Sequence, residues 1–241
     1  MSLEQKIEHV RGVLASAQRD FAPLAFANSF GLEDMVLTDV IVREFPGIEI
    51  FTLDTGRLPE ETYDLMKRVA DHYGVRLRVF YPDTGALERH VNQHGPNAFY
   101  DSVELRKECC HIRKVEPLKR ALRGKRAWLT GLRREQAVTR RDLPVSEFDQ
   151  ATGLQKFNPL ADWSHLDVWT YVQARGVPYN ALHERGYPSI GCAPCTRAVE
   201  EGEDIRAGRW WWEDPAGKEC GLHRAANGVL KRAVSSAADP T

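Results

Sequence analysis

The sequence predicts an α/β fold in which a parallel sheet is flanked by helices. Short apolar runs that suit strands alternate with amphipathic helical segments along the first two thirds of the chain. Such alternation is typical of βαβ units, which place helices on the faces of a parallel sheet. A chain of 241 residues with 42 % hydrophobic side chains is also long enough to build a sizeable core.

Strands are expected where four to six apolar residues are followed by a polar or glycine-containing turn. The first is a buried run after the opening helix, and the last two lie on either side of the turn at 151–153. The expected strands are residues 23–27, 48–53, 75–80, 127–130, 145–148 and 154–157.

Helices are expected where apolar residues recur at intervals of three and four. Pro59 suits the first turn of its helix, and Ser164 is a suitable N-cap. In the helix after Ser164, we expect Leu166, Trp169 and Val172 to face inward. The expected helices are residues 3–21, 32–45, 59–73, 84–94, 114–122 and 165–175.

The C-terminal part of the chain differs in composition from the rest. Glycine and proline become frequent from Gly186 onward, which predicts loops rather than regular elements. We therefore expect an α/β domain over residues 1–205 and a mobile C-terminal arm over residues 206–241.

The charge balance excludes one class of function and favours another. The chain has 33 basic and 34 acidic side chains, so it lacks the basic surplus that a general nucleic-acid-binding protein needs. Residues 104–141, however, carry 13 basic and 4 acidic side chains. This segment is either a solvated helix face or the binding region of a small anion, and its compactness fits the anion better.

The sequence also predicts a soluble, cytoplasmic protein without a membrane partner. No apolar run approaches the roughly 18 residues that a membrane span needs, and the first twenty residues carry charges throughout. The oligomeric state is left open, a homo-oligomer included.

Four of the five cysteines form two close pairs. Cys109 and Cys110 are adjacent, and Cys192 and Cys195 form a C-x-x-C pair. Four thiolates suit either a structural zinc ion or an iron–sulfur cluster. Adjacent cysteines are unusual zinc ligands, so the iron–sulfur cluster is favoured.

The fifth cysteine, Cys220, stands apart in a polar segment rich in glycine. A lone cysteine is most often a small buried hydrophobic residue. Here the polar surroundings disfavour burial, and His223 nearby favours the thiolate. Cys220 is therefore a candidate nucleophile.

Six motifs, spread over about residues 25–225, together resemble those of the adenylyl-sulfate reductases, in the family that also holds the phosphoadenylyl-sulfate reductases. The motifs are Ser-Phe-Gly-Leu-Glu-Asp at 29–34, Leu-Asp-Thr-Gly at 53–56, Lys-Glu-Cys-Cys-x-x-Arg-Lys-Val-x-Pro-Leu at 107–118, Gly-Leu-Arg-Arg-x-Gln-x-x-Thr-Arg at 131–140, Gly-Cys-x-x-Cys-Thr-Arg at 191–197 and Glu-Cys-Gly-Leu-His at 219–223.

The resemblance implies a Rossmann-like, adenine nucleotide α-hydrolase-like fold and a reaction of sulfate assimilation and cysteine biosynthesis. Adenylyl sulfate would be reduced to sulfite and AMP through an S-sulfocysteine on Cys220, with thioredoxin or glutaredoxin as the reductant. The four paired cysteines match the ligands of a [4Fe–4S] cluster, and Lys114 matches a lysine that couples cluster and substrate.

The resemblance also implies that the Ser29–Asp34 loop, Leu53 and Arg133 lie around the adenylate and that Arg206 and Arg209 lie near the phosphosulfate. The turns at 29–34 and 54–56 are expected to face the same cleft because they follow the carboxyl ends of strands. The expected substrate-binding residues are Ser29, Phe30, Gly31, Glu33, Asp34, Leu53, Asp54, Thr55, Gly56, Arg133, Arg206 and Arg209. Each turn taken alone is explained more simply as an ordinary connection between a strand and a helix; their matching positions in the fold favour the binding site.

Three alternatives remain. The chain could reduce phosphoadenylyl sulfate, alone or as a second substrate. It could be a pyrophosphatase of the ATP-dependent tRNA-thiolating type, although Phe30 and Met35 depart from the Ser-Gly-Gly-x-Asp-Ser loop of those enzymes. It could also be a nucleotide sensor whose cysteines hold zinc.

Overall fold

The computed structural model describes residues 1–137 and 140–214. Six strands form one sheet in the order β3-β2-β1-β4-β6-β5, with every neighbouring pair parallel except β5 and β6. The strands are β1 (Leu24–Ala27), β2 (Glu49–Leu53), β3 (Arg78–Phe80), β4 (Ala127–Leu129), β5 (Ser146–Asp149) and β6 (Leu154–Phe157). The predicted α/β class is confirmed.

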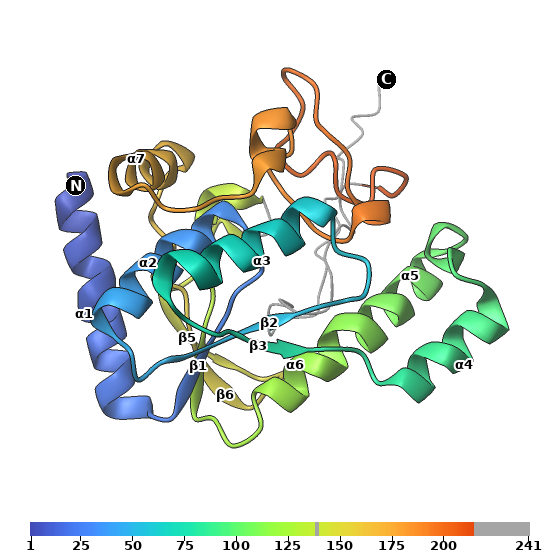
Figure 1. Ribbon diagram of the computed structural model, residues 1–241, viewed down its shortest axis with the longest axis horizontal. Coiled ribbons are helices and arrows are strands. Elements are labelled where there is room, and N and C mark those ends of the chain that lie inside the picture. The colour runs from blue at the N-terminus through green and yellow to red at the C-terminus, as the bar shows by residue number, and fades with distance from the viewer. Residues whose placement is uncertain (138–139, 215–241) are drawn as a thin grey trace, which may run out of the picture.

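Helices lie on both faces of the sheet (Figure 1). The α-helices are α1 (Leu3–Phe21), α2 (Leu32–Glu44), α3 (Glu60–Tyr73), α4 (Thr84–His94), α5 (Val103–Cys110), α6 (Glu116–Ala121) and α7 (His165–Arg175). Short 3-10 helices are η1 (Ala98–Tyr100), η3 (Arg134–Gln136), η5 (Ala181–Arg185) and η6 (Ala193–Cys195), and η2 (His111–Val115) is a π-turn.

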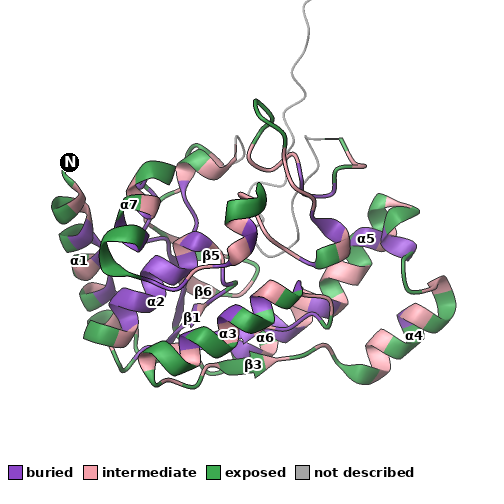
Figure 2. Ribbon diagram, turned by 45° about the horizontal axis from the view of Figure 1, so that its top comes forward, coloured by how far each residue is buried: buried purple, intermediate pink, exposed green. Residues whose placement is uncertain are grey.

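The core is divided by the alternation of side chains along the central strands. Leu24 and Phe26 of β1 pack on the face covered by α1, α2, α3 and α7. Ala25 points to the opposite face and packs with α6. Figure 2 shows buried residues concentrated on α2 and the central strands, in agreement with this division.

One predicted detail of α7 is wrong. Leu166 was expected to face inward, yet it is 74 % exposed, whereas Val168 and Tyr171 are buried beside Val172. Ser164 caps the helix as predicted. The helix packs on α2 through the turn that holds Val168 and Val172, four residues apart, and this rotates Leu166 toward solvent.

The predicted helix at residues 114–122 is the final part of a longer helical stretch. This stretch consists of α5, the π-turn η2 and α6, which follow one another without a break. A π-turn adds one residue to a helical turn and re-aims the side chains around it, often at functional sites. Cys109 and Cys110 end α5, and Arg113 and Lys114 lie within η2.

The connection after α7 covers the carboxyl ends of the strands. It runs through η5 and η6 to residue 214, and it is drawn in orange in Figure 1. Within residues 1–137 and 140–214, no helix is both long and apolar enough to cross a membrane.

Candidate active site

A cavity of about 220 Å³ lies beyond the carboxyl ends of β1, β2 and β4. Its opposite wall is formed by residues 188–191 and 205–210. The chain runs from β1 to β2 in one direction of the sheet, and β4 lies on the other side of β1. In open α/β sheets, ligands bind where the strand order reverses in this way.

Ten of the predicted active-site residues line this cavity. They are Ser29, Gly31, Glu33, Asp34, Leu53, Thr55, Lys114, Arg133, Arg206 and Arg209. The residues come from the two turns after β1 and β2, the π-turn, the segment after β4 and the C-terminal connection. The fold therefore brings together, from distant parts of the chain, residues that the sequence motifs indicated as candidates.

Phe30 shapes the first turn from behind the cavity wall. Its ring is buried in the main core, and its backbone has a φ of 60°, which is unusual for a residue other than glycine. The amide N–H of Phe30 donates to Asn28 Oδ1 (2.6 Å), while Asn28 Nδ2 donates to Thr38 Oγ1 on α2 (2.9 Å). These contacts fix the turn and thereby the orientation of Ser29 and Gly31.

Asp34 is a buried carboxyl group on the cavity wall. The backbone N–H and the hydroxyl of Ser29 both donate to Asp34 Oδ2, at 2.7 and 2.6 Å. Burial raises the pKa of Asp34 to about 6, although the hydrogen bonds from Ser29 favour the ionised form. Gly131 packs so closely against Asp34 that a Cβ at this position would overlap the carboxylate.

Asp54 and Gly56 shape the second turn in the same way as Phe30 shapes the first. Asp54 Oδ1 accepts hydrogen bonds from the Gly56 N–H (2.7 Å) and from the Tyr63 hydroxyl (2.9 Å). Gly56 has a φ of 69°, in the left-handed region that glycine adopts without strain. The turn thus directs Leu53 and Thr55 into the cavity.

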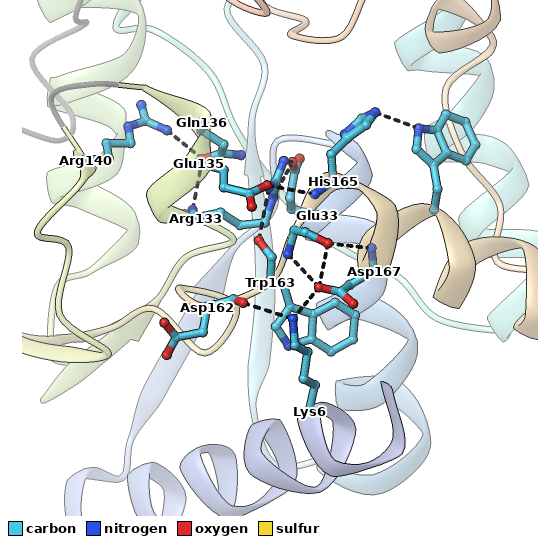
Figure 3. Close-up of polar contacts among 12 residues, drawn as sticks. Lys6, Glu33, Arg133, Glu135, Gln136, Arg140, Asp162, Trp163, His165 and Asp167 are labelled. Carbon is cyan, nitrogen blue, oxygen red and sulfur yellow. Dashed lines mark hydrogen bonds and ion pairs between the residues drawn. The ribbon is translucent and has the colours of Figure 1, made fainter. Parts of the chain in front are cut away.

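Arg133 is buried and its charge is matched by Glu33 (Figure 3). Its Nε and Nη2 donate to Glu33 Oε1 at 2.9 and 2.7 Å, and its Nη1 donates to the Trp163 carbonyl at 3.1 Å. Arg133 therefore joins the segment after β4 to α2. Its role in the wall is to hold Glu33 and the adjoining turn in place.

Arg209 is also buried, but its hydrogen-bond acceptors among the described residues are neutral. Nη1 donates to the Ile190 carbonyl (3.2 Å) and to Ser189 Oγ (3.4 Å), and Nε makes no hydrogen bond with the described residues. Among those residues, none places a carboxylate within 4 Å of this guanidinium. Gly191 leaves room for it, because a Cβ there would overlap the guanidinium.

The four paired cysteines gather around a second, small cavity beside the first. Cys109 and Cys110 come from the end of α5, and Cys192 and Cys195 from the ends of η6. All four are free thiols. Arg57, Arg106, Arg113 and Lys114 line the same cavity, so the sulfur atoms lie in strongly positive surroundings.

These surroundings affect the thiols differently. Burial opposes ionisation of Cys192, but Lys114 and a hydrogen bond with Thr55 (3.2 Å between Oγ1 and Sγ) lower its pKa below the ordinary value. Burial and the neighbouring Cys192 raise the pKa of Cys195 to about 12. Burial also raises the pKa of Cys109, against the effect of Arg113. Four soft donors from two segments, with cations around them, form a donor set that fits a thiolate-ligated metal group.

Residues 206–214 pack against the cysteine-lined cavity. Arg106 is fully buried and donates to Glu213 in a bidentate ion pair, at 2.8 and 2.6 Å. The buried Trp210 lies between Arg106 and Arg209, whose guanidinium carbons are 4.7 and 4.8 Å from its ring centroid. The predicted Cys220 and His223 lie outside the described residues, as does most of the predicted arm.

Several cavity residues carried no signal in the sequence. His165, His183 and Trp128 line the large cavity. His165 Nε2 accepts a hydrogen bond from Trp169 Nε1 (3.0 Å), and burial lowers the pKa of both histidines, which favours their neutral forms. Isolated histidines and a tryptophan within a strand form no motif, so only the fold reveals their position.

Comparisons with known sequences all indicate the same family for this chain. The chain matches the phosphoadenosine phosphosulfate reductase domain over residues 23–198. It is 58 % identical to the adenosine 5'-phosphosulfate reductase of Allochromatium vinosum over 212 residues, covering 88 % of this chain and 83 % of that one. It is 55 % identical to the enzyme of the same name from Burkholderia cepacia over 221 residues, covering 92 % and 88 % of the two chains.

Comparison with solved structures agrees. A phosphate complex of phosphoadenylyl-sulfate reductase from Candida auris superposes with a TM-score of 0.67 at 31 % identity, covering 83 % of this chain and 98 % of that one. FMN adenylyltransferase from Candida glabrata, at 14 % identity and a TM-score of 0.57, covers 87 % of this chain and 72 % of its own, and shares the fold alone. On the family match and these identities, the chain belongs to the phosphoadenosine phosphosulfate reductase domain family.

Proposed function

We propose that this protein reduces adenylyl sulfate to sulfite and AMP in sulfate assimilation, using a thiol protein as the electron donor. The observation that carries this proposal is Arg209, a buried guanidinium that faces the cavity without a carboxylate partner among the described residues. A buried cation of this kind is stabilised by an anionic ligand. The phosphosulfate of adenylyl sulfate supplies that anion, and two relatives that are more than half identical carry the name of this reductase.

The two parts of the cavity suit the two parts of the substrate. The wall at the strand ends offers Leu53 and the backbone of the Ser29–Gly31 turn, and the neutral His165 on α7 lines the same cavity; these groups suit an adenosine. Arg206, Arg209 and Lys114 lie toward the C-terminal connection and the π-turn, and they suit the phosphosulfate. Arg133 supports the first wall through Glu33.

We further propose that the four paired cysteines hold a [4Fe–4S] cluster. Their joint position around one cavity and the cations that line it support this assignment. When bound, the cluster would hold the two cysteine-bearing segments together and contribute its electrostatic field to the neighbouring cavity. The zinc alternative remains an outcome of the metal analysis described below.

The reaction proceeds in two thiol steps in this proposal. The Cys220 thiolate attacks the sulfur of adenylyl sulfate, so that an S–S bond forms, the S–O bond to the phosphate breaks and AMP leaves. Because two anions approach each other, Arg206, Arg209 and Lys114 lower the barrier by neutralising charge. A thiolate of thioredoxin or glutaredoxin then attacks the Cys220 sulfur and releases sulfite, and a second thiol of that partner completes the disulfide.

In this proposal, the two parts of the chain have different roles. Residues 1–205 bind the nucleotide and the cluster, and residues 206–241 form the arm that brings Cys220 to the substrate and then to the reductant. Residues 206–214, which pack on the cysteine-lined cavity, are the base of that arm. His223 favours the thiolate of Cys220. A cytoplasmic location suits a reaction that depends on reduced thiols.

The decisive experiment compares wild type with Cys220→Ser. We expect the variant to release no sulfite from adenylyl sulfate with thioredoxin, while its iron content and its affinity for AMP remain unchanged. Mass spectrometry of wild type treated with substrate alone should find a sulfonate on Cys220. Sulfite release by the serine variant, or an adduct on another residue, would refute the assignment.

Three further measurements separate the alternatives. Sulfite release from adenylyl sulfate and from phosphoadenylyl sulfate, compared at equal concentration, determines which nucleotide is preferred. Metal analysis should find close to four irons per chain; one zinc ion without iron would instead support the zinc-bound nucleotide sensor. Pyrophosphate release from ATP would support the thiolating type of enzyme.

A further inference from the structure

A second group of metal-binding side chains lies away from both cavities. His90 and His94 lie on α4, and Glu108 lies on α5. One ligand atom from each side chain lies within 4.8 Å of the other two. Residues four apart share one face of a helix, so α4 presents both imidazoles on the face that meets Glu108.

His90 is an unusual buried group. It is the single buried residue of α4, all of which is described, and only 6 % of its surface is exposed. Its Nδ1 makes no hydrogen bond with the described residues, although Glu108 Oε1 lies 3.4 Å away. A buried polar atom without a hydrogen bond destabilises the folded state, so a ligand that binds His90 Nδ1 would remove this cost.

The separation between His90 Nδ1 and Glu108 Oε1 is compatible with two ligands of one metal ion, and the ligand atoms of the three side chains all lie within 4.8 Å of one another. Nitrogen and oxygen ligands lie about 2.0–2.2 Å from a tetrahedral zinc ion, which places two ligands of one ion roughly 3.3–3.6 Å apart. The distance of 3.4 Å between His90 Nδ1 and Glu108 Oε1 falls in this range. His94 is half-buried and Glu108 is exposed, so one side of the group is open to solvent and to an entering ion.

We propose that His90, His94 and Glu108 form a binding site for a divalent first-row metal ion, with Zn²⁺ as the best match. Two imidazoles and one carboxylate complete three positions of a tetrahedral zinc ion, and water takes the fourth. The site is separate from the cysteine-lined cavity and does not depend on the reductase proposal. Because Glu108 directly precedes Cys109, a bound ion ties α4 to the helix end that carries the adjacent cysteines.

The test is a Zn²⁺ titration of the purified full-length protein by calorimetry, after weakly bound metal has been removed by dialysis. His94→Asn is the main variant, and His9→Asn is its matched control, because His9 is exposed on α1. Wild type and His9→Asn should bind one Zn²⁺ per chain, and His94→Asn should bind it at least tenfold more weakly. Iron and zinc are counted in the same samples, so that zinc taken up by the cysteines is recognised.

One further variant and one further measurement test the proposal independently. Glu108→Gln removes a ligand charge at an exposed position and should weaken Zn²⁺ binding in the same direction. Thermal unfolding of wild type should shift upward with Zn²⁺, and the shift should be absent in His94→Asn. Equal affinity in wild type and His94→Asn, or no zinc bound beyond the cysteine site in wild type, would overturn the proposal.

Discussion

The two walls of the cavity at the strand ends differ in whether their buried charged groups have partners. At the strand ends, Arg133 is matched by Glu33 and Asp34 receives two hydrogen bonds from Ser29. On the wall formed by the C-terminal connection, Arg209 meets neutral oxygen atoms only, within the part of the chain that the structure describes. The first wall is complete by itself, whereas the second is completed by an anion.

This difference shows how neighbouring contacts offset the cost of burying Arg209 without a counter-ion. A buried charge without a counter-ion destabilises the folded state. The connection that carries Arg209 is held by the buried ion pair between Arg106 and Glu213 and by Trp210, which is 1 % exposed. Strong anchoring beside Arg209 therefore offsets its cost and keeps it pointed at the cavity in the absence of a ligand.

The largest expected effect is a loss of stability when Glu33, on the wall at the strand ends, is replaced. Glu33→Ala removes the closer of two carboxylates beside the buried Arg133 and leaves only the more exposed Glu135, at 3.5 Å, so we expect the free energy of unfolding to fall by about 3 kcal/mol or more. Urea unfolding monitored by circular dichroism measures this change. Glu33→Gln, which keeps a hydrogen-bond acceptor, should lose less, and a loss below about 1 kcal/mol in the alanine variant would contradict the comparison.

The next largest effect is a dependence of stability on pH, caused by Asp34. The folded state binds the Asp34 proton more tightly than the unfolded state does, because the pKa of Asp34 is raised from 3.8 to about 6. Its contribution to stability is therefore fully present below pH 4 and is lost as pH rises through about 6. Relative to Asp34→Asn, wild type should lose up to about 3 kcal/mol between pH 4 and 7.

Urea unfolding of both proteins at several pH values between 4 and 7 measures this difference. Parallel stability curves for the two proteins would show that Asp34 titrates normally. The aspartate and asparagine side chains have nearly the same size, so the comparison isolates the charge.

A smaller effect, on ligand affinity, is expected on the wall formed by the C-terminal connection. Arg209→Gln should weaken adenylyl sulfate binding by about 2 kcal/mol, or roughly 30-fold, since hydrogen bonds to charged groups contribute about 1.5–3 kcal/mol. Adenosine, which lacks the anion, should bind to both proteins equally in calorimetry. A fall in stability as large as that of Glu33→Ala would mean that Arg209 has a counter-ion after all.

The smallest effect is expected at Ser189. Its hydroxyl accepts a long hydrogen bond from Arg209, with 3.4 Å between the heavy atoms. Ser189→Ala should therefore change adenylyl sulfate affinity by less than about threefold, because contacts of this length are weak. A tenfold loss would show that Ser189 itself contacts the ligand.

The sequence predicted most of the fold from local signals. The bounds of α1, α4 and α7 agree with the helical periodicity and the caps, and the turns after β1 and β2 meet at one cavity as parallel strands require. Leu166 was misplaced because the rotation of α7 is set by its contact with α2, which a local pattern does not contain.

The composition of the cavity wall was predicted better than its electrostatics. Arg133 was selected as a ligand-binding cation, but its partner Glu33 is 100 residues away in the sequence. The ion pair of Arg106 with Glu213 and the group around His90 likewise join distant segments. The roles of Cys220 and of the metal ligands stay predictions.

The π-turn has a consequence for how the two cavities communicate. It places Lys114 in the lining of both cavities. A charged group bound in either cavity would change the electrostatic potential at Lys114, so we expect ligands in the two cavities to be coupled electrostatically through this residue.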